Sequence, residues 1–223
     1  RRQEGIALGY ANLLNRSAGA AYVGIGFRVP NYLWTAGQWV DATTTFTDDT
    51  VDAQDRGASD FALETTTVND GFIISSDVPF NAVLIDVGTA SVDAVSVARA
   101  ARYSNAAGTG WSALTTILHT ASATNCSTNT ETAIAWQVPT DWGKHVSGLG
   151  TGTPVGKYLV NVRATDAPTT AGLATAISIY RIYFLTSISA DTSKTVDLIP
   201  AEAWFQSGDG LVSFFSVADA ENQ

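Results

Sequence analysis

The sequence lacks most of the residues on which disulfide, metal and nucleophile chemistry depend. Its 223 residues include one cysteine, Cys126, two histidines, His119 and His145, and no methionine. A single cysteine excludes an intrachain disulfide and a cysteine-based zinc cluster. No nucleophile motif is present, because there is no Gly-x-Ser-x-Gly sequence and Cys126 has no basic neighbour in the sequence. Without a nucleophile to activate, both histidines are expected to have surface or capping roles. We therefore expect no enzyme, no catalytic residue and no cofactor.

Long apolar runs are also missing. No stretch reaches the roughly 18 apolar residues of a transmembrane helix, and no charged segment followed by an apolar one marks a signal peptide. The sequence therefore predicts no membrane span. The chain begins Arg1-Arg2 without a methionine, as expected of a processed product or a fragment.

Charge of either sign is scarce, because only 15% of the residues are charged while 45% are hydrophobic. This composition excludes general disorder, and the length suits one large all-β domain, or at most two small ones. The net charge of −9 and the pI of about 4.5 predict a surface that repels nucleic acid and anionic membranes. We expect neither as a partner.

The first 21 residues read as an extended N-terminal arm, with at most one helical turn at residues 10–15. Glycines interrupt any longer helix there, and residues 1–40 carry four arginines against one glutamate. Five side chains in the arm need burial: Ile6, Leu8, Tyr10, Leu13 and Leu14. We expect the arm to dock on its own domain or on another subunit. Alternatively, the arginines are ordinary solvated side chains.

From residue 22 to residue 223 the pattern predicts a single domain built from many short strands. The expected strands are rich in β-branched and aromatic residues and are separated by Gly, Pro, Asn and Asp turns. They are predicted at 20–29, 61–66, 71–75, 80–87, 96–103, 112–118, 133–137, 156–164, 175–184, 195–198 and 211–217. No amphipathic helix is evident, so the predicted fold is an all-β, jelly-roll-like antiparallel β-sandwich with an extended N-terminal arm.

An ordered set of motifs follows the central strands. The set is Asp77-Val78-Pro79-Phe80-Asn81, Ile85-Asp86-Val87-Gly88, Arg102-Tyr103-Ser104-Asn105, Gly110-Trp111-Ser112-Ala113-Leu114 and Trp136-Gln137-Val138-Pro139-Thr140-Asp141-Trp142, with a final strand at 156–163. This order resembles a β-sandwich module common in tailed-phage virion proteins. The resemblance covers residues 70–177, about half of the chain; the hairpin at 104–111 is longer than usual, and Arg163 stands where two arginines are often found. It implies a fold and a virion setting more than an activity.

Tryptophans offer two interpretations. Trp111, Trp136 and Trp142 suit the edge of a sandwich core, where a large apolar face packs and the indole N–H finds a partner. A row of aromatic rings also suits sugar stacking, which stays an alternative for these three. Trp34 and Trp39, outside the resemblance, are the candidates for a ligand platform, and a carbohydrate-binding module would expose Trp34, Trp39 or Trp111 together on one concave face.

The least hydrophobic window, at residues 48–60, reads as a long exposed loop. Its carboxylates Asp48, Asp49, Asp52 and Asp55 are candidates for a cation site, because calcium prefers oxygen ligands. The spacing does not match an EF-hand, and the alternative is a solvated acidic loop.

These observations lead to a structural hypothesis. The expected role is to decorate or cement a bacteriophage capsid, at its surface, through contacts with the major capsid protein or other virion subunits. A closed homo-oligomer, a trimer among the options, would cover the arm and the apolar C-terminal segments at 203–205 and 211–217. The alternative is a carbohydrate- or receptor-binding module of a fibre or tail appendage. A glycosidase is disfavoured, because no spacing suggests paired carboxylates.

Overall fold

The computed structural model describes residues 10–14, 21–57, 60–92, 99–114, 117–119, 126, 131–188, 193–197 and 212–218. No helix in these ranges is long and apolar enough to cross a membrane. The described residues form one short α-helix, α1 (Thr50–Gln54), one 3₁₀ helix, η1 (Asn31–Leu33), and fifteen strands. The strands are β1 (Tyr10–Leu14), β2 (Ala21–Arg28), β3 (Trp34–Val40), β4 (Thr45–Asp48), β5 (Phe61–Ala62), β6 (Gly71–Ser76), β7 (Ala82–Thr89), β8 (Arg99–Ser104), β9 (Trp111–Ala113), β10 (Ile117–His119), β11 (Glu131–Trp136), β12 (Tyr158–Ala164), β13 (Leu173–Ile188), β14 (Ser193–Asp197) and β15 (Val212–Ala218).

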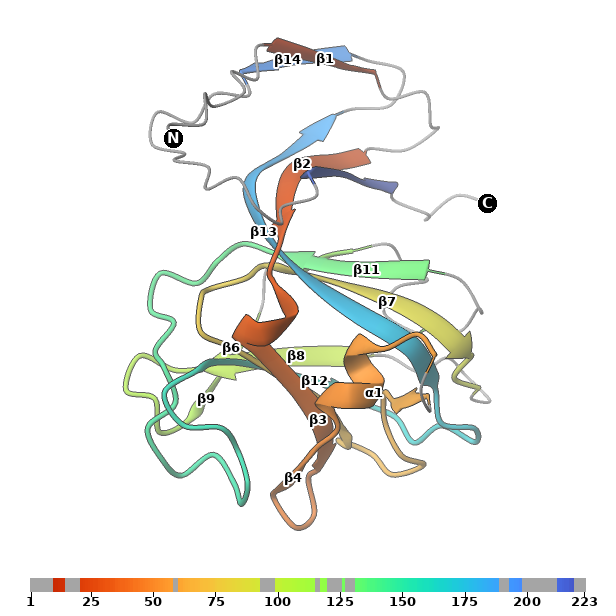
Figure 1. Cartoon of the computed structure of the whole chain (residues 1–223), viewed down its shortest axis with the longest axis vertical. Coiled ribbons are helices and arrows are strands. Elements are labelled where there is room, and N and C mark those ends of the chain that lie inside the picture. Colours follow the sequence, from red (N-terminus) through yellow and green to blue (C-terminus); the bar gives the residue numbers. More distant parts are fainter. Residues whose placement is uncertain are drawn as a thin grey trace.

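Two antiparallel sheets form the body of the molecule (Figure 1). The seven-stranded sheet has the order β10-β11-β7-β13-β2-β15, with β5 also paired to β13, and the six-stranded sheet has the order β4-β3-β6-β12-β8-β9. Eight of these strands can be numbered 1 to 8 along the chain: β2, β6, β7, β8, β9, β11, β12 and β13. In these numbers the seven-stranded sheet contains the order 1-8-3-6 and the six-stranded sheet the order 2-7-4-5. This is the strand order of a jelly roll. The predicted all-β, jelly-roll-like antiparallel sandwich is confirmed, with β3 and β4 added beside β6.

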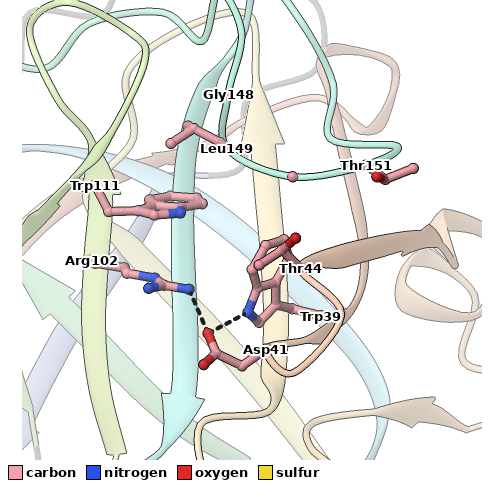
Figure 2. A pocket seen from close by; sticks show the side chains of 9 residues that line it. Trp39, Asp41, Thr44, Arg102, Trp111, Gly148, Leu149 and Thr151 are labelled. Carbon is pink, nitrogen blue, oxygen red and sulfur yellow. Dashed lines mark hydrogen bonds and ion pairs between the residues drawn. The ribbon is translucent and has the colours of Figure 1, made fainter.

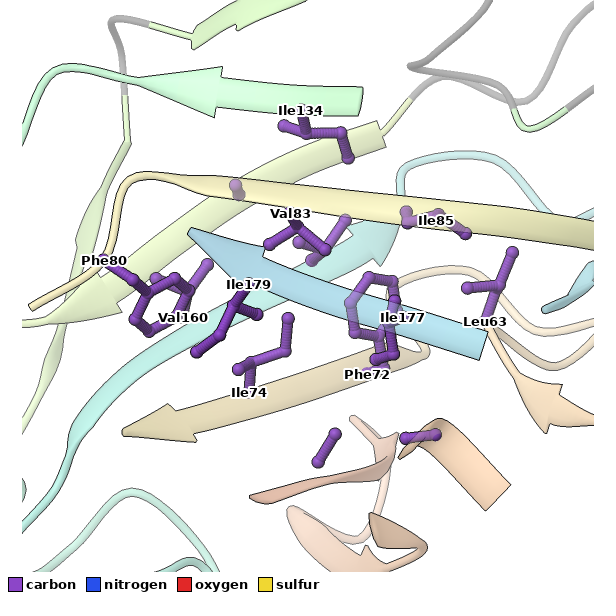
Figure 3. Packing of buried hydrophobic residues seen from close by; sticks show 14 of the residues in the cluster. Leu63, Phe72, Ile74, Phe80, Val83, Ile85, Ile134, Val160, Ile177 and Ile179 are labelled. Atoms are coloured by element: carbon purple, nitrogen blue, oxygen red, sulfur yellow. The ribbon is translucent and has the colours of Figure 1, made fainter. Parts of the chain in front are cut away.

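The main core lies between the two sheets (Figure 3). Along β7, Val83, Ile85 and Val87 are buried while Leu84 and Asp86 remain partly exposed, which is the alternation of a strand with one face on a core. The prediction that Trp136 and Trp142 pack in the core is confirmed, since they are 0% and 9% exposed and belong to this cluster. Both lie against Phe80, at ring distances of 5.5 and 5.4 Å.

The six-stranded sheet is buried on both faces. In β6, Phe72 and Ile74 join the main core, whereas Ile73, on the opposite alternation, joins a second cluster. That second cluster consists of Trp39, Phe46, Ile73, Leu149 and Leu159, with Trp111 packed against it. Leu149 belongs to the loop between β11 and β12, so a loop covers this outer face.

One end of the seven-stranded sheet extends beyond the sandwich (Figure 1). The first half of β13, up to Tyr180, pairs with β7, and the second half, from Tyr180 to Ile188, pairs with β2 alone. Strand β15 pairs with the other edge of β2. We call this part, together with the two-stranded sheet of β1 and β14, the extension.

The predicted arm lies partly in the extension. Tyr10, Leu13 and Leu14 belong to β1, so the segment is a strand and the helical turn suggested at residues 10–15 is not formed. Strand β1 pairs with β14 of the same chain. Ile6 and Leu8 lie outside the described residues.

Candidate functional site

A pocket of about 390 Å³ opens on the outer face of the six-stranded sheet (Figure 2). Its walls come from β3 and the turn after it, from the hairpin of β8 and β9, and from the loop between β11 and β12. The lining residues are Trp39, Asp41, Thr44, Arg102, Trp111, Gly148, Leu149, Gly150 and Thr151. The site therefore joins three segments that are far apart in the sequence.

Asp41 and Arg102 form the polar floor of the pocket. Arg102 Nη2 donates to Asp41 Oδ1 at 3.2 Å, and the indole N–H of Trp39 donates to the same oxygen at 3.2 Å. Arg102 Nε donates to Asn161 Oδ1 at 3.0 Å, and the backbone N–H of Asp41 donates to Asp70 Oδ1 at 2.8 Å. Because Asn161 and Asp70 are buried, both members of the ion pair are held in one geometry.

The electrostatics of the floor are balanced. Burial and the nearby charge of Arg163 lower the pKa of Arg102, while Asp41 acts in the opposite direction. An arginine still keeps its proton at neutral pH. The two cationic side chains, Arg102 and Arg163, thus stand close to the two carboxylates of Asp41 and its neighbour Asp70.

Trp111 forms the aromatic wall. It is half-buried, meets the Trp39 ring edge-on at 6.4 Å and 74°, and lies over the Arg102 guanidinium at 4.9 Å. The β8–β9 turn that presents it is fixed by Asn105, whose Oδ1 accepts from the N–H groups of Thr109 and Gly110.

The loop between β11 and β12 forms the roof, and one glycine permits its close approach. Gly150 has φ +126°, and a Cβ there would lie 2.5 Å from the Thr44 carbonyl oxygen and 2.7 Å from the Trp39 ring. The backbone N–H of Thr151 donates to that carbonyl at 2.9 Å, and Thr151 in turn accepts from Phe46 N–H at 2.9 Å. The roof is therefore bonded directly to the β3–β4 hairpin.

His145 secures the base of this loop. Surface or capping roles were expected for it, but it is 2% exposed, so a surface role is wrong. Its Nδ1 lies 2.7 Å from the Pro154 carbonyl oxygen, which can only accept, so Nδ1 carries the proton. The side chain of His119, in β10, lies outside the described residues.

The predicted ligand platform of Trp34 and Trp39 is wrong. The two rings are 2% and 1% exposed, and they belong to different clusters on opposite faces of the sheet. They stand five residues apart on β3, and an odd spacing on a strand places side chains on opposite faces. The aromatic ring that reaches the pocket with Trp39 is Trp111, which the sequence placed in the core edge.

The expected acidic loop contains α1, and its carboxylates have local partners. Asp48 Oδ1 accepts from the Thr50 N–H and hydroxyl at 2.9 and 2.6 Å, and Asp55 Oδ1 accepts from Gly57 N–H at 2.9 Å. Burial, followed by the nearby Asp52, raises the pKa of Asp49. Within the described ranges, no group of three or more His, Cys, Asp or Glu side chains could hold a metal ion.

A buried ion pair was not anticipated from the sequence. Glu64 accepts from Arg99 Nη2 and from the Ser91 hydroxyl, and it also accepts from Gly172 N–H at 2.7 Å. The two charged side chains are 0% and 2% exposed, so no substrate can reach them. Cys126 lies nearby, with its carbonyl accepting from Ser91 N–H at 2.9 Å, and burial raises the pKa of its thiol to about 11. The cluster is structural.

Comparison with protein-family models, with curated proteins and with solved structures yields no significant match for the chain. The function is therefore argued from the fold and from the geometry of the pocket.

Proposed function

We propose that the chain is a structural protein of a bacteriophage virion, which decorates or cements the capsid surface through subunit contacts. Jelly rolls recur in viral capsid and lectin domains, which supports this setting by analogy. The order of motifs at residues 70–177, similar to a virion β-sandwich module, supports it independently.

The extension is the observation that carries the proposal. β15 is an edge strand that pairs only with β2, and β1 pairs only with β14 among the described strands. The sequence of β15 has apolar residues at both even and odd positions: Val212, Phe214, Phe215 and Val217. An apolar edge strand favours association with another chain, and soluble proteins rarely leave one uncovered. The partner is a second copy or another virion subunit.

Two measurements test the proposal. Light scattering gives the mass of the purified chain, and co-sedimentation measures its binding to capsids of the phage that encodes it, prepared without this protein. A closed oligomer that pellets with these shells is expected, because a cement protein stabilises the assembled lattice by mass action. A monomer that stays in the supernatant at every concentration overturns the proposal.

A truncated chain tests whether the N-terminal arm contributes to the contact with the capsid. A variant without residues 1–19 keeps the whole sandwich but loses β1, so β14 loses its partner. If the arm contributes to assembly, this variant binds shells more weakly than the full chain. Equal binding would remove the arm from the proposal and leave the β15 edge.

The pocket favours a second function, the recognition of a carbohydrate or receptor by a fibre- or tail-type module. Its walls combine Trp111 with the Arg102–Asp41 pair, and such a mixture of aromatic and polar groups is typical of small-molecule sites. Binding of the purified chain to host cell envelopes, abolished by Trp111→Ala, tests this function. Envelope binding that the substitution leaves unchanged would exclude the pocket from it.

A further inference from the structure

We propose that the pocket of Trp39, Asp41, Arg102, Trp111 and Leu149 binds a neutral saccharide unit. The inference rests on the second function above and gives it a ligand class. It is independent of the capsid-binding role, which the extension carries.

Hydrogen-bonding groups of both kinds converge on the pocket. Arg102 donates to Asn161 and Asp41 with two of its five N–H groups. In the part of the chain that the structure describes, no acceptor is paired with the Trp111 indole N–H, and Figure 2 shows its nitrogen on the side facing Arg102 and Asp41. Both donors to Asp41 use Oδ1, so Oδ2 can accept from a ligand. Thr44 and Thr151 also line the pocket.

This combination matches the hydroxyl groups of a sugar. Each hydroxyl both donates and accepts, and a neighbouring pair of hydroxyls can bridge a guanidinium and a carboxylate at once. Trp111, which is only half-buried, supplies the apolar surface on which the C–H groups of a sugar ring can pack. A purely apolar ligand would leave the polar floor unpaired at a large cost.

The charge balance favours a neutral ligand over an anionic one. The charge of Arg102 is already opposed by Asp41 at 3.2 Å, and the nearby charges of Arg163 and Asp70 offset each other. A carboxylate or phosphate placed on Arg102 would approach Asp41 as well, and like charges at short range repel. A sugar acid is therefore expected to bind more weakly than its neutral counterpart.

The shape suits a short saccharide. The volume of about 390 Å³ lies near the lower end of the range of small-molecule pockets, about 300–1,000 Å³. The Asp41 side chain is 32% exposed, so the floor is open to solvent. The pocket is also largely preformed, because Gly150, Asn161 and Asp70 fix its roof and floor before any ligand arrives.

The experiment measures binding of defined sugars to the full chain. The neutral probes are maltose, cellobiose, lactose and N,N′-diacetylchitobiose, and the acidic probes are 3′-sialyllactose and digalacturonic acid. Titration calorimetry and intrinsic tryptophan fluorescence follow each titration. At least one neutral probe is expected to bind with a change in indole fluorescence, because Trp39 and Trp111 line the site. Tighter binding of the acidic probes, or no binding of any neutral probe, overturns the inference.

Variants assign the binding to this pocket. Trp111→Ala removes the aromatic wall, and Arg102→Lys keeps the charge but loses the guanidinium fork, so each should weaken binding by about tenfold or more. Tyr32→Ala is the matched control, because Tyr32 is 79% exposed and does not line the pocket; its affinity should stay unchanged. Should Trp111→Ala fail to fold by circular dichroism, Arg102→Lys decides the outcome. Unchanged affinity in a folded pocket variant overturns the inference.

Capsid co-sedimentation separates this inference from the leading proposal. Trp111→Ala and Arg102→Lys should bind shells like the unmodified chain, because neither residue lies in the extension. Shell binding without saccharide binding would overturn the saccharide site alone. Saccharide binding without shell binding would overturn the capsid role alone.

Discussion

The two faces of the six-stranded sheet are buried in different ways. The inner face meets a second sheet, and its cluster contains apolar side chains such as Phe72, Ile74 and Val160. Arg99, on the same alternation of β8 as the cluster residues Ala101 and Tyr103, is buried there together with Glu64 and is closed to solvent. The outer face meets a loop, and there Trp39 and Leu159 stand beside Arg102 and Asn161. A sheet presents a regular surface that interlocks with its partner, whereas a loop follows the surface less closely and leaves a pocket. The comparison indicates that the inner face stabilises the molecule, whereas the outer face leaves room for the proposed ligand.

The largest effect is expected on the inner face. Trp136 is 0% exposed and lies 5.5 Å from Phe80, so Trp136→Ala should lower the free energy of unfolding by about 3–5 kcal/mol. Denaturant unfolding measures this value. Trp111→Ala, on the outer face, is the matched control and should cost clearly less, because Trp111 is only half-buried. Equal losses for the two variants would remove the distinction between the faces.

A similar loss is expected when the buried ion pair is broken. Glu64→Ala leaves the charge of Arg99 buried without its carboxylate, which costs about 3–5 kcal/mol. Asp41→Ala breaks the partly exposed pair with Arg102 and should cost much less, because solvent screens that pair. If the two variants have the same unfolding midpoint, burial does not distinguish the pairs.

The rate at which the Cys126 thiol is alkylated gives a second measure of the effect of Glu64→Ala. In the native protein the thiol is buried and its pKa is raised to about 11, so alkylation by iodoacetamide at pH 8 should be very slow. Loss of Glu64 should speed the reaction, because the Ser91 segment that contacts Cys126 loses an anchor. Fast alkylation of the unmodified protein would contradict the burial of this thiol.

The roof of the pocket should respond to a single methyl group. Gly150→Ala places a Cβ against the Thr44 carbonyl and the Trp39 ring, at a φ that favours glycine, and the overlap alone should cost about 1–3 kcal/mol. Tryptophan fluorescence should change as the loop lifts from Trp39. The control is Gly156→Ala, which has φ +77° but no atom within 4 Å, so it carries backbone strain without overlap. A larger effect at Gly156 would contradict the close approach at Gly150.

The smallest effect concerns Asp49, away from both faces. Burial and the nearby Asp52 raise its pKa above the ordinary value of 3.8, so its contribution to stability is greatest below that pH and declines as the pH rises. Asp49→Asn should therefore raise the melting temperature slightly at pH 7, and the gain should vanish below about pH 4. Asp49 makes no side-chain cap bond to α1, so the substitution removes none. A melting temperature that falls at pH 7 would contradict this assignment.

Local patterns in the sequence were enough to predict the sandwich and most of its central strands, but not β1 or β3. The alternation of Val83, Ile85 and Val87 is visible without any knowledge of their partners. Trp34 and Trp39 lie in a segment that was not predicted as a strand, and only once β3 is known does their odd spacing exclude a shared platform. Helix α1, at five residues, is too short to show a helical period.

The pocket could not be predicted, because its parts depend on long-range register. Asp41 and Arg102 are 61 residues apart, and nothing near either residue indicates the other. Glu64 and Arg99 likewise meet only after the strands around them have paired. Such pairs of charges resemble ordinary surface residues in the sequence. Two residues gave a signal near the site: Trp39, which was a candidate ligand-platform residue, and Trp111, which lies in the long hairpin.

The position of β13 has a consequence for how the chain acquires its structure during synthesis. β2 comes long before its two neighbours in the sheet, β13 and β15, and Arg28 pairs with Tyr180. A nascent chain therefore carries β2 without a partner until β13 has been synthesised. Contacts of such long sequence separation form slowly, and exposed strands in the interim promote aggregation. The larger sheet is thus expected to close around β2 only after β13 and β15 have both been synthesised.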